Sequence, residues 1–302
     1  MKNLIRLVSL STILLLTPLV WAQDEDEFAK VKIETIQVRD NIYMLLGQGG
    51  NIGVSAGEDG VYIIDDQFAP LTEKIKNAIA KLSDKPIRFV INTHWHFDHT
   101  GGNENLGNDG SIIIANDNVY TRMNQESFVA AFNRTMPPSP KAALPIITFN
   151  DTMTLHLNGE DAVITHVGNA HTDGDSFIHF KKSNVIHTGD LWFNGLYPFI
   201  DASSNGSIDG AIKAVGQVLA VADDNTKIIP GHGPLGDKAE LKQYRSILIT
   251  LRDRMRKLMD EGKTLEEIKA LKPNAADYDE TLGKGFLSPD RFLEILYSVM
   301  DK

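Results

Sequence analysis

The sequence predicts an α/β (α+β) fold, a four-layer αββα sandwich of two mixed β-sheets with helices on both outer faces. Two observations support this prediction. Segments with the period of strands alternate with segments with the period of helices, and the scheme of several strands followed by a helix occurs twice along the chain. The chain has 302 residues, of which 42% are hydrophobic and 23% are charged, which suffices for one large core.

The region that follows residue 32 is rich in strands. Apolar alternation and one apolar run predict sequential antiparallel strands at residues 33–38, 42–46, 52–56 and 61–64. Apolar residues at helical spacing from Leu71 to Leu82 then predict a helix. A strand of the buried type follows at residues 87–92 and leads directly into a polar loop.

The second half of the sandwich is predicted from a similar series. Strands are expected at residues 111–115, 152–157, 162–167, 176–180, 185–188 and 226–230. Apolar residues from Ile208 to Leu219 recur at helical spacing and predict an amphipathic helix. Residues 126–145 contain Met136-Pro137-Pro138-Ser139-Pro140, which is too rich in proline for a helix or a central strand, so a long surface loop is predicted.

The chain from residue 238 onward is predicted to be helical, with segments at 238–261, 264–271 and 289–300. No linker separates this part. We therefore expect a single domain over residues 23–302, in which residues from about 238 to 302 form a C-terminal helical extension.

Residues 1–22 have the pattern of a secretory signal peptide. Lys2 and Arg6 precede an apolar run at residues 7–20, and a short small-residue site ends at Ala22. The alternative is an uncleaved anchor, but the run is shorter than the roughly 20 residues that a membrane span needs. We expect cleavage after Ala22, secretion to the periplasm of a bacterium, and no stable membrane association afterwards. Residues 24–27 are predicted to be a disordered, charged lead-in.

Composition excludes several classes of function. The chain has no cysteine, so disulfides, thiolate nucleophiles and thiolate metal ligands are excluded. The net charge of -10 disfavours nucleic acid as a partner, because nonspecific affinity for nucleic acid comes from Lys and Arg that neutralise phosphates. A small-molecule substrate is the expected partner, and the oligomeric state is left open.

The strongest chemical signal is the run His94-Trp95-His96-Phe97-Asp98-His99 at the end of a predicted strand. Imidazole and carboxylate groups suit zinc, and a catalytic zinc site uses about three protein ligands and leaves one position for water. Four ligand-type side chains exceed one such site. A second metal is therefore predicted if later strand ends supply further ligands. Trp95 and Phe97 alternate with these side chains and are expected to point into the core.

Three further candidates follow later strands, each close to glycine: His171 in residues 168–175, Asp190 after Gly189, and His232 between two glycines. Glycine lets the backbone approach a metal without a clash of Cβ. The remaining histidines lie in no such motif and are expected to be ordinary core or surface residues: His156, His166, His179 and His187. The residues after Asp190 either line a substrate pocket or pack in the loop, namely Trp192, Phe193, Asn194 and Tyr197.

The order of these motifs resembles the metallo-β-lactamase superfamily, over residues 42–235. The superfamily has an aspartate after an early strand, then H-x-H-x-D-H, a lone histidine, a lone aspartate and a final histidine. The resemblance implies two zinc ions per chain. By that resemblance, one metal is held by His94, His96 and His171, the other by Asp98, His99 and His232, and both by Asp190. Asp65 would orient a ligand from behind, although the sequence does not say whether Asp65 or Asp66 faces the site.

The resemblance also implies a hydrolase. Two zinc ions would lower the pKa of a shared water from roughly 15.7 toward about 7, and the resulting hydroxide would cleave an ester, lactone, thioester or β-lactam. Asp98 would be the catalytic residue that orients this hydroxide. Asp190 stands where cysteine-containing β-lactamases have Cys, which favours the glyoxalase II/lactonase-like branch. The signal peptide and the lack of a basic glutathione-binding segment argue against glyoxalase II itself.

Two alternatives from other classes stay open. One is a mononuclear-iron sulfur oxidoreductase on the same fold, and the other is a noncatalytic zinc-binding or partner-binding protein. The full set of seven ligand-type residues weakens the iron alternative, because it supplies two metal sites. The substrate, any useful cleavage of β-lactams, the native metal and the role of the C-terminal helices are not predicted.

Overall fold

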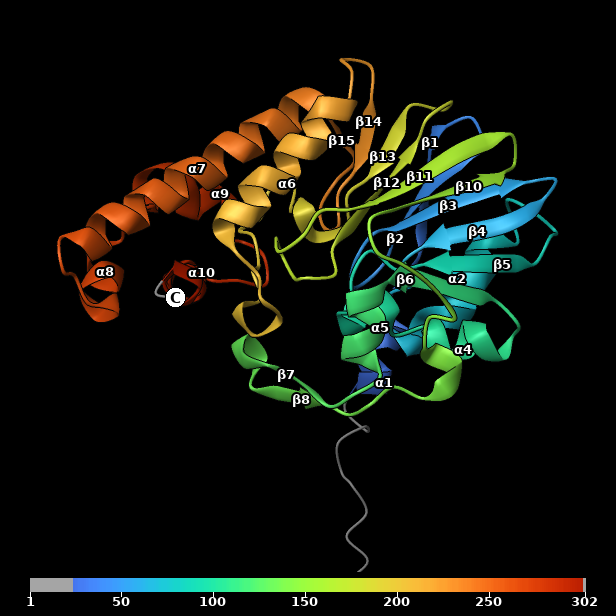
Figure 1. Ribbon diagram of the computed structural model, residues 1–302, viewed down its shortest axis with the longest axis horizontal. Coiled ribbons are helices and arrows are strands. Elements are labelled where there is room, and N and C mark those ends of the chain that lie inside the picture. Colours follow the sequence, from blue (N-terminus) through green and yellow to red (C-terminus); the bar gives the residue numbers. More distant parts are fainter. Residues whose placement is uncertain (1–23, 301–302) are drawn as a thin grey trace, which may run out of the picture.

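The computed structural model describes residues 24–300 and contains a large seven-stranded sheet (Figure 1). The predicted signal peptide, residues 1–22, lies outside the described residues. Neighbouring strands of this sheet follow the order β1-β2-β3-β4-β5-β6-β9. The first four are paired antiparallel, as predicted, and the strands β4, β5, β6 and β9 are parallel to one another. Their bounds are β1 (Glu34–Arg39), β2 (Ile42–Leu46), β3 (Ile52–Gly57), β4 (Gly60–Ile64), β5 (Ile87–Ile91), β6 (Ile112–Asn116) and β9 (Ile147–Phe149).

The second sheet has six strands in the order in which they occur along the chain, from β10 to β15. Strands β13 and β14 are parallel, and the other neighbours are antiparallel. A helix crosses over between the two parallel strands, as parallel pairing requires. The bounds are β10 (Thr152–Leu157), β11 (Glu160–His166), β12 (Ser176–Phe180), β13 (Val185–His187), β14 (Lys227–Ile229) and β15 (Gly236–Asp237).

The two sheets pack on each other, and helices cover both outer faces (Figure 1). Alternation along β4 shows the arrangement: Tyr62 and Ile64 lie in the core between the sheets, whereas Val61 and Ile63 face the helices. This four-layer αββα sandwich confirms the predicted fold class. One outer layer contains α2 (Thr72–Ile79) and α4 (Asn103–Asn108), and the other contains α6 (Ile208–Val221), α7 (Lys238–Asp260) and α10 (Pro289–Met300).

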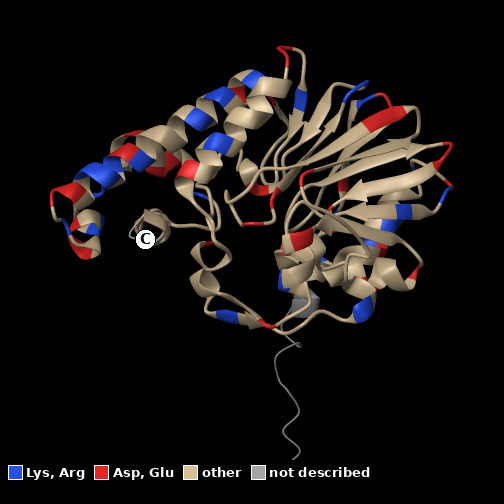
Figure 2. Ribbon diagram, in the orientation of Figure 1, with Lys and Arg blue, Asp and Glu red and all other residues tan. Residues whose placement is uncertain are grey.

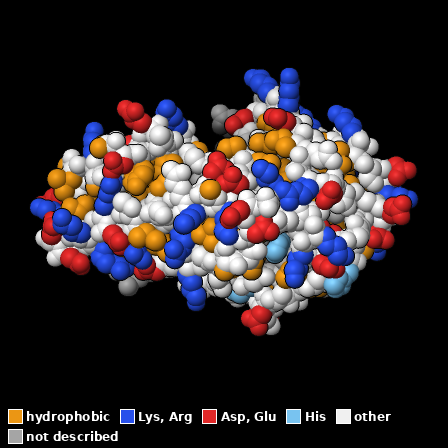
Figure 3. Space-filling model, turned by 90° about the horizontal axis from the view of Figure 1, so that it is seen from above, with side chains coloured by type: hydrophobic (Ala, Val, Ile, Leu, Met, Phe, Trp, Pro, Cys, Tyr) orange, Lys and Arg blue, Asp and Glu red, His pale blue; other side chains and the backbone are white. Residues whose placement is uncertain are grey.

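The C-terminal extension is helical as predicted. A capping box of Asp237 and Glu240 begins α7, whose buried residues, from Leu241 to Met255, recur at spacings of three or four. Basic residues outnumber acidic ones along α7 (Figure 2), and side chains of both signs are intermixed over the face drawn in Figure 3. The remaining helices of this part are α8 (Leu265–Leu271) and α9 (Glu280–Leu282). Within residues 24–300, no helix is long and apolar enough to cross a membrane.

Two segments differ from the predictions. The lead-in was predicted to be disordered, but it forms helix α1 (Asp24–Ala29), and Lys74 Nζ donates to three backbone carbonyls at its end, two of them those of Phe28 and Ala29. The prediction was wrong because a cation distant in sequence satisfies these orphan carbonyls.

Residues 126–145 were predicted to be a loop throughout. The part before the prolines instead forms a hairpin of β7 (Ser127–Val129) and β8 (Arg134–Met136), and the proline-rich part has no strand or α-helix. The hairpin was not predicted because each of its strands has only three residues, too few to show an alternating pattern. Helix α5 (Asp117–Met123) precedes it and was also not predicted.

Candidate metal centre

All seven candidate ligands lie in loops or short helices that follow strands. His94 and His96 lie between β5 and the short helix α3 (Phe97–Thr100), which itself carries Asp98 and His99. The other three candidates follow β11, β13 and β14, and they are His171, Asp190 and His232. The structure brings the side chains of all seven together.

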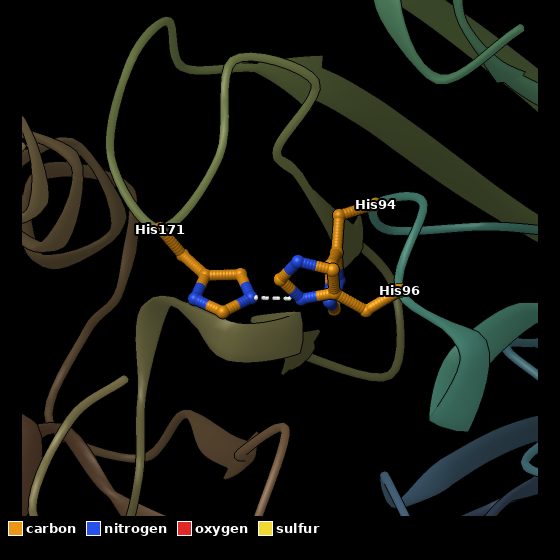
Figure 4. A group of neighbouring side chains, drawn as sticks. All are labelled: His94, His96 and His171. Carbon is orange, nitrogen blue, oxygen red and sulfur yellow. Dashed lines mark hydrogen bonds between the residues drawn. The ribbon is translucent and has the colours of Figure 1, made fainter. Parts of the chain in front are cut away.

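His94, His96 and His171 form the first group, and their ligand nitrogens lie within 4.8 Å of one another (Figure 4). His171 Nδ1 donates to the carbonyl oxygen of Phe199 at 2.7 Å, which leaves a lone pair on Nε2. His96 Nε2 lies 3.0 Å from the Asp201 carboxylate and donates to it, which leaves a lone pair on Nδ1. The two nitrogens that carry these lone pairs, His171 Nε2 and His96 Nδ1, are 2.8 Å apart. A cation bound by both would stabilise this arrangement.

The ring of His94 is fixed in the same way. The hydroxyl of Thr93 donates to Asp65 Oδ2 at 2.7 Å, so it accepts the proton of His94 Nδ1 at 3.0 Å. His94 Nε2 therefore carries a lone pair, and this buried atom has no hydrogen-bond partner within residues 24–300. Burial lowers the pKa of His94 well below its usual value and that of His171 to about 4, so both imidazoles are neutral and able to bind a metal.

Asp98, His99 and His232 form the second group. His99 Nδ1 lies 2.8 Å from Asp65 Oδ2, so the second nitrogen of His99 points into the group. His99 Nε2 is 3.3 Å from His232 Nε2 and 3.6 Å from Asp98 Oδ2, and the last two atoms are 3.4 Å from each other. Three donor atoms thus converge on one point.

Asp65, and not Asp66, faces the cluster. The carboxylate of Asp65 accepts from the backbone and hydroxyl of Thr93 and contacts His99. The carboxyl group of Asp66 instead accepts from the backbone N–H of Gly102 at 2.8 Å. Asp65 has φ = +61°, a left-handed conformation that could not be predicted from the sequence.

Asp190 presents one oxygen to each group. Its Oδ2 lies 3.4 Å from His171 Nε2 and 3.8 Å from His94 Nε2. Its Oδ1 lies 3.1 Å from His99 Nε2 and 3.4 Å from His232 Nε2. Oδ1 is buried and has no hydrogen-bond partner among the described residues. A carboxylate in this position can bridge two cations.

Two glycines allow this close approach. A Cβ atom on Gly231 would lie 2.1 Å from Asp190 Oδ1, and a Cβ atom on Gly50 would lie 2.1 Å from the ring of His99. Any larger residue at either position would displace a side chain of the cluster. The predicted role of glycine beside the candidate ligands therefore has a structural basis at Gly231.

The negative charges of the carboxylates at the second group also favour a bound cation. Burial lowers the pKa of His232, but Asp190 and Asp98 outweigh this effect and raise it to about 9. Burial raises the pKa of Asp98, but His99 and His232 outweigh this effect and lower it to about 2. The carboxylates thus attract positive charge, which metal ions supply when they replace the protons of the imidazoles.

Asp201 is part of the centre and was missed in the sequence. Its buried carboxylate binds His96 and accepts from the backbone N–H of Ser203 at 2.9 Å and from the hydroxyl of Ser204 at 2.5 Å. Burial raises the pKa of Asp201, but the bonds with His96 and the serines hold it well below its usual range. No spacing signal connects Asp201 with His96, because the two lie 105 residues apart.

Replacing Asp201 with alanine is expected to weaken metal binding by roughly 10- to 100-fold, because the ring of His96 loses the partner that fixes its tautomer and orientation. Titration of the apoprotein with metal against a competing chelator measures the affinity. Asp223→Ala is the matched control, since Asp223 also accepts from neighbouring side-chain and backbone groups but contacts no histidine of the cluster. Equal affinities of the wild type and Asp201→Ala would contradict the positioning role.

The histidines expected to be ordinary take no part in the candidate metal groups of residues 24–300. His187 Nε2 lies 3.0 Å from the carbonyl of Asn51, and His156 pairs with Asp161 at 2.7 Å. His166 Nδ1 lies 2.9 Å from the backbone oxygen of Asp175.

The aromatic residues near the motifs divide into core and site residues. Trp95 is buried in the core as predicted, but Phe97 is only half-buried and contacts Phe68 and Arg134, so the prediction was wrong for Phe97. Phe193 stacks on His232 with centroids 5.2 Å apart. Of the other residues after Asp190, Trp192 and Tyr197 lie in the core and Asn194 bonds to Pro234.

The family model described as the metallo-beta-lactamase superfamily matches residues 46–235, which is more than half of the chain. The chain belongs to the metallo-β-lactamase superfamily. The match contains all seven candidate ligands and ends before α7, so the C-terminal helices lie outside it. Members of this superfamily bind metal ions, and the groups of His and Asp found here are of the kind that could hold them.

Three similar proteins illustrate the relationship. The probable metallo-hydrolase MJ0888 of Methanocaldococcus jannaschii is 25% identical over 69% of this chain and 94% of its own length. The metallo-beta-lactamase IND-1 of Chryseobacterium indologenes is 23% identical over 77% of this chain and 92% of its own length. A solved metallo-beta-lactamase from Pontibacter korlensis has the same fold, with a TM-score of 0.59 and 18% identity over 72% of this chain and 99% of its own. Membership of the superfamily supports a metal-dependent hydrolase.

Proposed function

We propose that this chain is a secreted di-zinc hydrolase that cleaves an ester, lactone, thioester or β-lactam bond. The observation that carries the proposal is the position of Asp190, whose Oδ2 faces His94 and His171 of the first group and whose Oδ1 faces His99 and His232 of the second. His94, His96 and His171 would hold one zinc ion, Asp98, His99 and His232 would hold the other, and Asp190 would be shared.

Zinc fits the chemistry of the donors. Among the described residues the cluster offers only imidazole nitrogens and carboxylate oxygens, which suit zinc. The hydrogen bonds of Thr93, Phe199 and Asp201 direct three imidazole lone pairs inward before any ion binds. Two groups of donors favour a pair of ions over the single iron of the oxidoreductase alternative.

When bound, the two zinc ions would lower the pKa of water toward about 7 and polarise the carbonyl oxygen of the substrate. The protein residues supply the remaining requirements. Asp98 would orient the attacking water by accepting its hydrogen bond, since Asp98 is the most exposed carboxylate of the cluster. Asp65 and Asp201 would keep His99 and His96 in place. Secretion is proposed from the signal-peptide pattern of residues 1–22.

One experiment separates the three candidate classes. Metal content is measured on the purified protein, which is then assayed with β-lactams, lactones, esters and thioesters before and after removal of metal by a chelator. We expect two zinc ions per chain, hydrolysis of at least one substrate class, loss of hydrolysis on chelation, and recovery on addition of zinc.

Other outcomes would contradict the proposal. One iron per chain with consumption of oxygen would support the sulfur oxidoreductase. Bound metal without turnover of any substrate in the panel would support a binding protein. Full hydrolysis by metal-free protein would exclude a metal-dependent mechanism.

A further inference from the structure

The metal cluster is accessible from the side of Asp98 and His232. Their side chains are 21% and 15% exposed, whereas those of the other five candidate ligands are at most 4% exposed. A substrate therefore reaches the centre past these two residues.

The C-terminal extension places an aromatic ring at this accessible side. Phe286 lies between α9 and α10, and its ring centroid is 6.1 Å from that of His232 and 6.2 Å from that of Phe193. Phe193 in turn stacks on His232 with an interplanar angle of 9°. Phe193 is fully buried, but Phe286 is 52% exposed. Phe286 thus extends the buried aromatic surface beside His232 out to the solvent.

The hairpin places a second exposed ring at the other half of the cluster. Phe132, at the turn between β7 and β8, is 44% exposed, and its centroid lies 5.2 Å from that of Phe199. Phe199 stacks on His96 at 5.6 Å. Each group of candidate ligands therefore has an exposed phenylalanine next to a buried one. Large apolar side chains left exposed beside a site are typical of a surface that binds an apolar group.

The kinds of charged side chain at the cluster favour a substrate whose apolar group carries no charge. Among residues 24–300, no ion pair of the cluster involves Lys or Arg. The guanidinium of Arg134 is 4.5 Å from the ring of Phe97 and stacks on it. Arg or Lys would give an anionic group on a substrate a strong charge-assisted hydrogen bond, whereas Phe132 and Phe286 offer apolar contact.

We propose that Phe286 binds an apolar group next to the bond that is cleaved, and that Phe132 offers a second apolar contact to the substrate. The protein would then prefer substrates with an aromatic or longer alkyl group. The inference rests on the proposed hydrolase function and deepens it. Phe286 lies outside the residues that the family model matches. The C-terminal extension therefore contributes a specificity residue from outside the matched region.

The test compares two esters that share a leaving group and differ in the acyl group, one phenylacetyl and one acetyl. For the zinc-loaded wild type, kcat/KM is expected to be higher for the phenylacetyl ester. Phe286→Ala is expected to lower the phenylacetyl-to-acetyl ratio of kcat/KM about tenfold, because a contact between aromatic rings is lost. Phe286→Tyr should keep the ratio, and calorimetry should show weaker binding of the uncharged phenylacetamide to Phe286→Ala than to the wild type.

Leu271→Ala is the matched control, since Leu271 is 55% exposed on α8 and has no contact with the cluster. It should leave kcat/KM for both esters and the binding of phenylacetamide unchanged. An unchanged ratio in Phe286→Ala, in protein that hydrolyses both esters, would overturn this inference alone. Failure of zinc-loaded wild type to hydrolyse any member of the panel would instead overturn the proposed function, and this inference with it.

Discussion

Replacing Asp190 with alanine is expected to weaken both metal sites and to lower kcat/KM on the order of 1000-fold, because the metals and the groups around them supply most of the catalysis. No other described carboxylate lies within 4 Å of ligand nitrogens from both groups. Metal content after dialysis, together with kcat/KM on the substrate found in the panel, measures both effects.

Asp190→Asn separates charge from shape. An amide has nearly the volume of the carboxylate, but one of its two polar atoms is an NH₂ group that donates and cannot bind a cation. One group of ligands therefore keeps its shared oxygen and the other loses it. The metal content of Asp190→Asn is expected to fall from two ions toward one.

Asp161→Asn is the control for these variants. Asp161 contacts His156 at 2.7 Å, so it is also an aspartate paired with a histidine, but the pair is exposed and distant from the cluster. Metal content and activity should match those of the wild type. Two tightly bound metals and full activity in Asp190→Ala would show that the shared position of Asp190 has no role in the site.

Much of the centre could be predicted because its residues follow strand ends. Parallel strands such as β4 and β5 in one sheet, or β13 and β14 in the other, bring their carboxyl ends to one edge of their sheet, so a motif after each strand indicates proximity without coordinates. Glycine beside Asp190 and His232 added a second signal. The same reasoning could not choose between Asp65 and Asp66, because the choice depends on the backbone twist at Asp65.

The residues that escaped prediction act through contacts that no local pattern records. Asp201 approaches His96 across 105 residues, and Phe286 reaches His232 from the C-terminal extension. Helix α1 is held by Lys74, which lies in another helix. In each case the partner is set by how the layers pack, and packing is a property of the whole chain.

Asp98 has two proposed tasks, which its variants can separate. Asp98→Asn preserves the size of the side chain and removes the negative charge that contacts His99 and His232. We expect kcat to fall by about 100- to 10,000-fold, the usual range for loss of a group that accepts a proton or orients a nucleophile. Metal affinity of the second group should fall as well, while the first group, which lacks Asp98, should keep its ion.

Activity at saturating zinc decides between the two tasks. If Asp98 only binds metal, excess zinc restores both the second ion and full kcat to Asp98→Asn. If Asp98 also orients the attacking water, the second ion returns but kcat stays low. The amide of Asp98→Asn must turn its oxygen toward the metal, so its NH₂ group, which can only donate, faces the water. We expect the second result, since Asp98 is the carboxylate of the cluster that a substrate and its water can reach, with a side chain 21% exposed against 4% for Asp190.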